Sequence, residues 1–169
     1  NRFQGTAHKF AVPLNRDVGH KRMNTTPYML GGPRWEINAV RSYSAFFRFL
    51  PTLVPPSSLL CLAEGVWDAE LTSFFHRYTC KPPDGLFQPA EFEDGAYVPI
   101  DESLLVELAN NSFRHAGPEI AMCVAVSCGT VQVLEWFDAP SDPISVALSI
   151  PQNAVEQFCR LVGAEYRKV

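Results

Sequence analysis

The chain of 169 residues has the length of one ordinary domain, and its 47% hydrophobic and 19% charged residues exclude an intrinsically disordered protein. Its apolar runs are far shorter than the about 20 residues of a membrane-spanning helix, so we expect no membrane partner. Residues 1–38 hold six basic and two acidic side chains, and the remainder holds eight basic and sixteen acidic ones. Because the body is acidic and repels phosphate, we also expect no nucleic-acid partner.

The first 34 residues show no sustained periodicity and end in the breaker Gly31-Gly32-Pro33, which predicts an extended N-terminal arm over residues 1–34. Apolar residues are spread through this arm, and its charge is opposite to that of the body. Both features indicate that the arm docks on the body or on a partner. Residues 35–169 are expected to form a single α+β domain.

Periodicity and capping signals predict the elements that follow the arm. In chain order they are a helix over 38–50, a strand over 58–63, a helix from the Asp68 cap to Tyr78, a long loop over 81–99 with a short strand near 86–92, a helix from the Asp101 cap that ends before Gly117, strands over 120–127, 130–137 and 144–150, a helix from Pro151 to a Gly163 cap, and an edge strand over 164–168. The fold class is therefore α+β, with a mixed sheet of about five strands, a C-terminal antiparallel meander and helices mainly on one face.

The stretch from Leu134 to Pro143 contains the candidate binding residues Glu135, Trp136, Asp138 and Asp142. Carboxylates and large rings gather there at a strand end, where loops commonly carry function. Strand alternation nevertheless places Glu135 and Trp136 on opposite faces of the sheet. Aspartates beside prolines are also ordinary turn residues, so a turn and a functional acidic loop both remain open.

Nothing in the sequence assembles a catalytic set. Cys128 lies at a predicted hairpin turn, but no histidine signature accompanies it. The four histidines have no partners at metal-ligand spacing, so neither a metal site nor a cofactor is expected. Glu91, Glu93 and Asp94 lack the pattern of a calcium loop and are interpreted as solvated charges.

Cysteine usage bears on the cellular compartment. The five cysteines are odd in number and lack a C-x-x-C pair, and most fall in apolar patterns. Such a set is typical of reduced, buried thiols, which indicates a cytoplasmic protein.

About two-thirds of the chain resembles a set of small uncharacterised bacterial α/β proteins. The resemblance covers residues 46–75, with Leu53-Val54-Pro55 and Asp68-Ala69-Glu70-Leu71, and the run from Glu135 to Pro151. Its most specific part is the Trp-x-Asp-Ala…Asp-Pro…Ile-Pro block from Trp136 to Pro151. The arm lies outside it. The resemblance implies a bacterial cytosolic setting and no particular activity.

These observations favour a non-catalytic protein-binding or interaction module that neutralises or scaffolds a partner, as an immunity-like protein does. The expected partner is another protein or a second copy in a homodimer. The alternative is a small enzyme or small-ligand binder that uses the acidic loop after Trp136. Convergence of Glu135, Asp138 and Asp142 on one concave pocket would favour the alternative.

Overall fold

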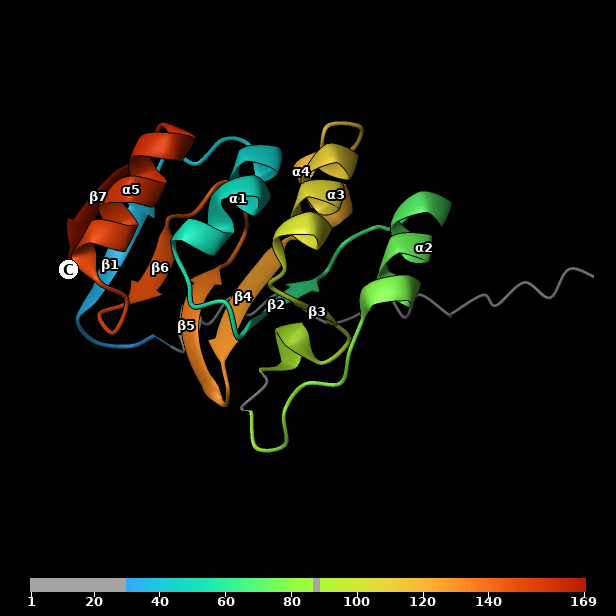
Figure 1. Ribbon diagram of the computed structural model, residues 1–169, viewed down its shortest axis with the longest axis horizontal. Helices are drawn as coiled ribbons and strands as arrows, with labels where there is room; N and C mark the ends of the chain where they lie inside the picture. The colour runs from blue at the N-terminus through green and yellow to red at the C-terminus, as the bar shows by residue number, and fades with distance from the viewer. Residues whose placement is uncertain (1–29, 87–88) are drawn as a thin grey trace, which may run out of the picture.

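A seven-stranded antiparallel sheet forms the centre of residues 30–86 and 89–169, which the computed structural model describes (Figure 1). The strand order across the sheet is β3-β2-β4-β5-β6-β1-β7. The strands are β1 (Arg34–Asn38), β2 (Ser58–Ala63), β3 (Ala96–Pro99), β4 (Cys123–Cys128), β5 (Val131–Trp136), β6 (Ile144–Ala147) and β7 (Glu165–Lys168).

Helices connect the strands, and their ends follow the capping signals in the sequence. The helices are α1 (Tyr43–Phe49), η1 (Leu50–Thr52), α2 (Ala69–Tyr78), η2 (Ala90–Phe92), α3 (Glu102–Ser112), α4 (Gly117–Ile120) and α5 (Gln152–Val162). Asp68 caps α2 by accepting from the backbone N–H groups of Glu70 and Leu71, and Asp101 caps α3 in the same manner. Gly163 ends α5 at φ 70°, a left-handed conformation that glycine adopts without strain. The predicted caps are thus confirmed.

The sheet differs from the predicted one in strand number and direction. It has more than the expected five strands within the described residues, and it is antiparallel rather than mixed. The predicted strand near 86–92 is wrong in its described part, where Ala90–Phe92 forms η2, and β3 lies later in the predicted loop. Both β1 and β3 pair with strands distant in the sequence, so tertiary contacts rather than local pattern select them.

The predicted edge strand is confirmed, because β7 pairs with β1 at one edge of the sheet. The predicted arm falls largely outside the described residues, which begin at residue 30, and Arg34 already belongs to β1. No helix in the described part of the chain combines the length and apolar character needed to cross a membrane.

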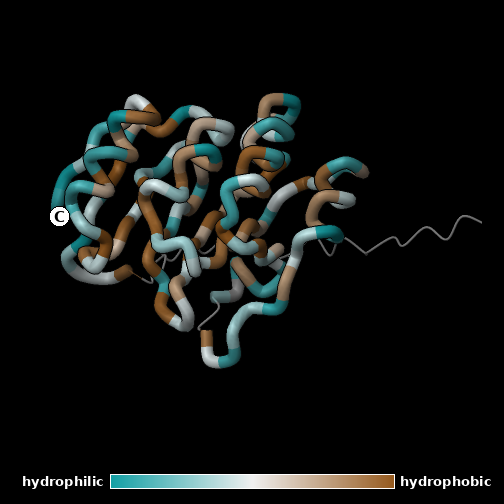
Figure 2. The backbone as a smooth tube through the Cα atoms, viewed as in Figure 1, coloured by the Kyte–Doolittle hydropathy of each residue, from teal (hydrophilic) through white to brown (hydrophobic). Residues whose placement is uncertain are grey.

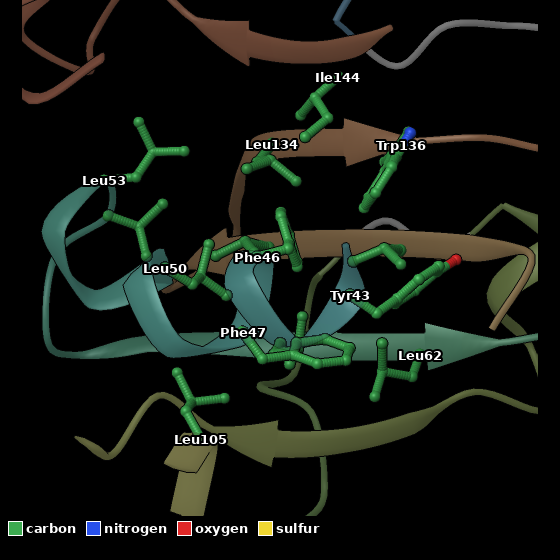
Figure 3. Close-up of a cluster of buried hydrophobic side chains, with 14 of the residues drawn as sticks. Tyr43, Phe46, Phe47, Leu50, Leu53, Leu62, Leu105, Leu134, Trp136 and Ile144 are labelled. Atoms are coloured by element: carbon green, nitrogen blue, oxygen red, sulfur yellow. The ribbon is translucent and has the colours of Figure 1, made fainter. Parts of the chain in front are cut away.

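The larger hydrophobic core lies between the sheet and the helices. Figure 1 shows α1 between α5 and α3, and Figure 2 shows hydrophobic and hydrophilic residues alternating along these helices. Figure 3 shows Phe46 close to Leu134 and Trp136 of β5, with Phe47 and Leu50 in the same cluster of side chains. All five side chains are at most 1% exposed. This packing buries the inner face of the central strands. The side chains on that face therefore belong to the core and have little access to solvent.

The opposite face of the sheet carries a second, smaller core. It contains Cys61, Ala63, Phe92, Tyr97, Cys123, Ala125 and Phe137. Phe92 belongs to η2, and its ring packs against Phe137 with centroids 5.7 Å apart. The loop between α2 and β3 therefore covers part of this face, and it places Glu91 and Asp94 beside the end of β2.

An ion-pair network ties β1 to β7 at one sheet edge. The carboxylate of Glu36 accepts from Arg34 at 2.8 Å and from Arg167 at 2.7 Å, and the Glu36 side chain is only 12% exposed. The hydrogen bond from Arg167, reinforced by Arg34, lowers the pKa of Glu36 even though burial opposes the shift. Glu36 therefore favours the folded chain while it is ionised.

We expect E36Q to lower the free energy of unfolding at about pH 7 by about 1–2 kcal/mol, because hydrogen bonds to charged groups are lost. The folded pKa is lowered, so this contribution is present above the unfolded carboxyl pKa and disappears as the pH falls through the folded pKa. Urea unfolding of both proteins should therefore give stabilities that converge as the pH falls through the folded pKa of Glu36. A difference that persists unchanged in acid would contradict the assignment.

Candidate functional site

The structure does not gather the four sequence-predicted binding residues into one site. Trp136 is 1% exposed in the larger core, where its ring stacks on Tyr43 at 5.2 Å and lies 5.0 Å from Phe46. Its indole N–H donates to the backbone carbonyl of Asp142 at 2.8 Å. The role shown by these contacts is structural, since Trp136 pins the following turn to the core.

Glu135 lies on the other face of β5, as strand alternation requires. Its carboxylate is buried and accepts from the backbone N–H of Leu30 at 3.3 Å and from Gln132 Nε2 at 3.1 Å. It is therefore separated by the sheet from the ring of Trp136.

Asp138 and Asp142 are exposed and belong to the turn between β5 and β6. Asp138 takes φ 45°, and its carbonyl accepts from the backbone N–H groups of Ser141 and Asp142. These are the hydrogen bonds of a tight turn. Neither aspartate lines the two cavities described below.

The cysteines are all unpaired thiols, and three of them are buried. Burial raises the pKa of Cys61 to about 12 and is the main cause that raises the pKa of Cys123 to about 12. A raised pKa keeps the thiol protonated and poorly nucleophilic at neutral pH. Cys128 is half-buried at the end of β4, with Ser57 Oγ 4.0 Å from its sulfur. No activating base contacts it within the described residues.

A cleft lies beside α2, on the side of the loop between α2 and β3. Two cavities, each of about 300 Å³, share Trp67 and Asp94. We call them together the Trp67 cleft, and their walls include Glu64, Trp67, Thr72, Phe75, Glu91 and Asp94. One cavity is mainly apolar and the other is bordered by the three carboxylates. The end of β2, α2 and η2 thus contribute one wall each.

The indole of Trp67 is held in a fixed orientation. Its N–H donates to the backbone carbonyl of Ile120 at 2.9 Å, and its ring packs on Phe75 with centroids 4.2 Å apart. Gly65 allows this approach, because a Cβ at that position would overlap both the indole nitrogen and the Ile120 carbonyl. An aromatic wall fixed before binding loses little entropy when a ligand arrives.

His76 lines the same cavity as Asp94, so a weakly basic side chain borders part of the Trp67 cleft. Among the described residues, no lysine or arginine forms an ion pair with Glu64, Glu91 or Asp94. Glu64 accepts from the thiol of Cys123 at 3.3 Å and takes φ 56° at the end of β2. Three negative charges beside an indole favour a positively charged ligand.

A second polar cluster lies at the start of α2, where Asp68 and Glu70 approach His115. The possible ligand atoms of these three residues lie within 4.8 Å of one another, and the sequence separates His115 from Asp68 too widely for a spacing rule. The backbone N–H of Leu71, more than His115, lowers the pKa of Asp68. These are the side chains in the described region whose arrangement is suited to a metal ion.

Comparisons with protein-family models, with curated proteins and with solved structures found no match to the chain. The geometry itself defines an α+β protein with an antiparallel sheet and an acidic, aromatic cleft at one side of it. Sequence reasoning missed Trp67, although the rule that drew attention to Trp136 applies equally to the segment that follows β2.

Proposed function

We propose that the chain is a non-catalytic protein-binding module whose Trp67 cleft receives a basic segment of a partner protein. The observation that carries the proposal is the set of three carboxylates around the fixed indole of Trp67, none of which forms an ion pair with a described lysine or arginine. A lysine or arginine side chain placed there gains cation–π attraction from the ring and charge-assisted hydrogen bonds from the acids. The acidic body adds long-range attraction for such a segment.

The paired cavities favour a peptide over a small amine. The cavity along α2 is bordered by Phe75 and Thr72, whereas its neighbour is bordered by Glu64 and Glu91. An extended segment that carries an apolar side chain next to a basic one fills both cavities. A small amine fills only the acidic one. This supports a protein as the partner and, with the resemblance, a cytoplasmic bacterial module that neutralises or scaffolds it.

A second copy of the chain is the other partner with matching charge. Residues 1–38 hold six basic and two acidic side chains, opposite in sign to the rest of the chain. Exchange of such arms between two copies would give a homodimer. Light scattering with and without residues 1–29 separates the two cases, because only an arm-mediated dimer becomes a monomer on truncation.

The alternative of a small enzyme or small-ligand binder at the acidic loop after Trp136 has less support. Trp136 and Glu135 lie on opposite sides of the sheet, and Asp138 and Asp142 are exposed turn residues. Their separation argues against a shared site at this loop, whereas the Trp67 cleft brings three carboxylates and an indole to adjoining cavities.

We expect a fluorescent peptide of alternating lysine and leucine to bind the full chain, and E64Q/E91Q/D94N to raise its Kd about tenfold, as does W67L. The matched control E102Q/D142N/E165Q removes three exposed carboxylates from other places and should change the Kd less than about threefold. Fluorescence anisotropy measures each Kd, and circular dichroism checks that every variant is folded. Equal losses in the two triple variants would show that only net charge attracts the peptide and would overturn the proposal.

A further inference from the structure

The cluster at the start of α2 contains a buried imidazole nitrogen, and no described neighbour forms a hydrogen bond with it. The side chain of His115 is only 10% exposed, and its Nε2 has no hydrogen-bond partner among the described residues. Nε2 lies 3.9 Å from Asp68 Oδ2. A buried polar atom without a partner costs free energy, so an unaccounted ligand is expected where it points.

Helix capping accounts for the position of only one of the two carboxylate oxygens of Asp68. Its Oδ1 accepts from the N–H groups of Glu70 and Leu71, both at 2.9 Å. Its Oδ2 lies toward His115 instead. Asp101 provides a comparison within the same chain, because it caps α3 through Oδ1 without a histidine in a described ion-pair contact. The feature that distinguishes the α2 terminus is therefore the approach of the histidine.

The other nitrogen of the imidazole lies near a further carboxylate. His115 Nδ1 lies 3.5 Å from Oε2 of Glu119 in α4, and the same oxygen accepts from the backbone N–H of Ala116 at 2.8 Å. Figure 1 shows α4 next to α3. A carboxylate behind a histidine favours the tautomer with the proton on Nδ1, which leaves the lone pair of Nε2 available to a metal ion.

We propose that Asp68, Glu70 and His115 form a binding site for a divalent transition-metal ion, with Glu119 orienting the imidazole. One nitrogen and two carboxylate ligands suit Zn²⁺ or Co²⁺, and three protein ligands leave a coordination position open to water or to a partner side chain. The ion's charge offsets the two carboxylates. Both carboxylates are about half exposed, so the ion reaches them directly from solvent.

Two local adjustments accompany binding. The ligand atoms span up to 4.8 Å, whereas neighbouring ligands of a tetrahedral zinc ion are about 3.3 Å apart, so the exposed carboxylates move inward. Glu70 also pairs with Arg114 at 2.6 Å, and both side chains are about half exposed. Exposed ion pairs contribute little stability, so a metal ion displaces this arginine at small cost.

Calorimetric titration of the full chain with Zn²⁺, and absorption spectra with Co²⁺, test the site. We expect saturable binding of one ion, with Co²⁺ bands of low coordination number and no thiolate charge-transfer band. D68N and H115Q should each raise the Kd about tenfold or more, whereas the matched control D101N should leave it unchanged. D68N keeps a capping side chain, so loss of binding does not reflect loss of the helix.

R114Q adds a test that misfolding cannot imitate. Removal of the arginine frees Glu70, so we expect Zn²⁺ to bind about threefold or more tightly. R77Q is its control, because it removes the same charge from an equally exposed ion pair with Glu107.

Tighter binding in R114Q alone supports the site. Equal tightening in both variants, a cysteine signature in the Co²⁺ spectrum, or affinity unchanged by D68N and H115Q would overturn it. None of these variants alters the named walls of the Trp67 cleft, so the outcome is independent of peptide binding.

Discussion

Replacement of Trp136 with alanine is expected to lower the free energy of unfolding by about 3–5 kcal/mol, the cost of removing a large buried aromatic side chain. The ring is 1% exposed and contacts Tyr43 and Phe46 of α1, so its loss leaves a cavity between β5 and that helix. The hydrogen bond to the Asp142 carbonyl is lost as well. Natural domains are stable by only about 5–15 kcal/mol, so this variant approaches the unfolding threshold.

Chemical denaturation followed by circular dichroism measures the decrease in the free energy of unfolding. The variant W136F distinguishes the contribution of ring packing from that of the indole hydrogen bond. Phenylalanine keeps most of the ring packing and removes the indole N–H, so we expect a smaller loss of about 1–3 kcal/mol from the unsatisfied Asp142 carbonyl and the lost ring volume. D142N changes only the exposed side chain and should change stability by less than about 0.5 kcal/mol. If W136A were as stable as the wild type, the structural role assigned to Trp136 would be wrong.

The helices α2, α3 and α5 and their caps were predictable because their signals are local, whereas α1 begins at Tyr43 rather than at residue 38 and α4 was not predicted. Asp68 and Asp101 each stand directly before an apolar helical pattern, and Gly163 follows one. A cap satisfies backbone N–H groups two or three residues away, so the sequence alone contains both partners. The central hairpins follow for the same reason, since short turns join β4, β5 and β6.

The strands at residues 34–38 and 96–99 could not be placed by such signals. β1 follows a glycine-proline breaker, and β3 has only four residues and ends in Pro99. Each forms because a distant strand offers hydrogen bonds, and β2 supplies them to β3 from more than 30 residues earlier. Strand propensity depends strongly on such neighbours.

The candidate sites depend even more on contacts across the fold. Trp67 becomes a cleft wall because Ile120 accepts its N–H, and His115 approaches Asp68 only after α2 and α3 pack. No spacing in the sequence connects these pairs. The polar residues near Trp136 were visible in the sequence. The sheet separates Glu135 from the tryptophan ring, and in the sequence only the alternation of side chains along the strand indicated this separation.

Substitution of Gly65 with alanine is expected to cost about 2–3 kcal/mol of stability and to abolish peptide binding at the Trp67 cleft. The added methyl group would overlap the indole nitrogen of Trp67 and the backbone carbonyl of Ile120, which form a hydrogen bond to each other. The carbonyl belongs to the backbone and has little freedom to move aside. The indole must therefore shift, and the shift breaks this hydrogen bond and displaces the wall that separates the two cavities.

Thermal and urea unfolding measure the stability of G65A, and anisotropy with the lysine-leucine peptide measures its binding at a temperature where the chain stays folded. G129A is the control, because a Cβ there meets nothing within 4 Å although φ is +60°. Only the left-handed backbone opposes that substitution, at about 1 kcal/mol, and peptide binding should be retained. Retained peptide affinity in G65A, with the indole of Trp67 displaced, would mean that the peptide binds elsewhere. Such a result would show that the recognition of basic segments does not depend on the fixed position of Trp67.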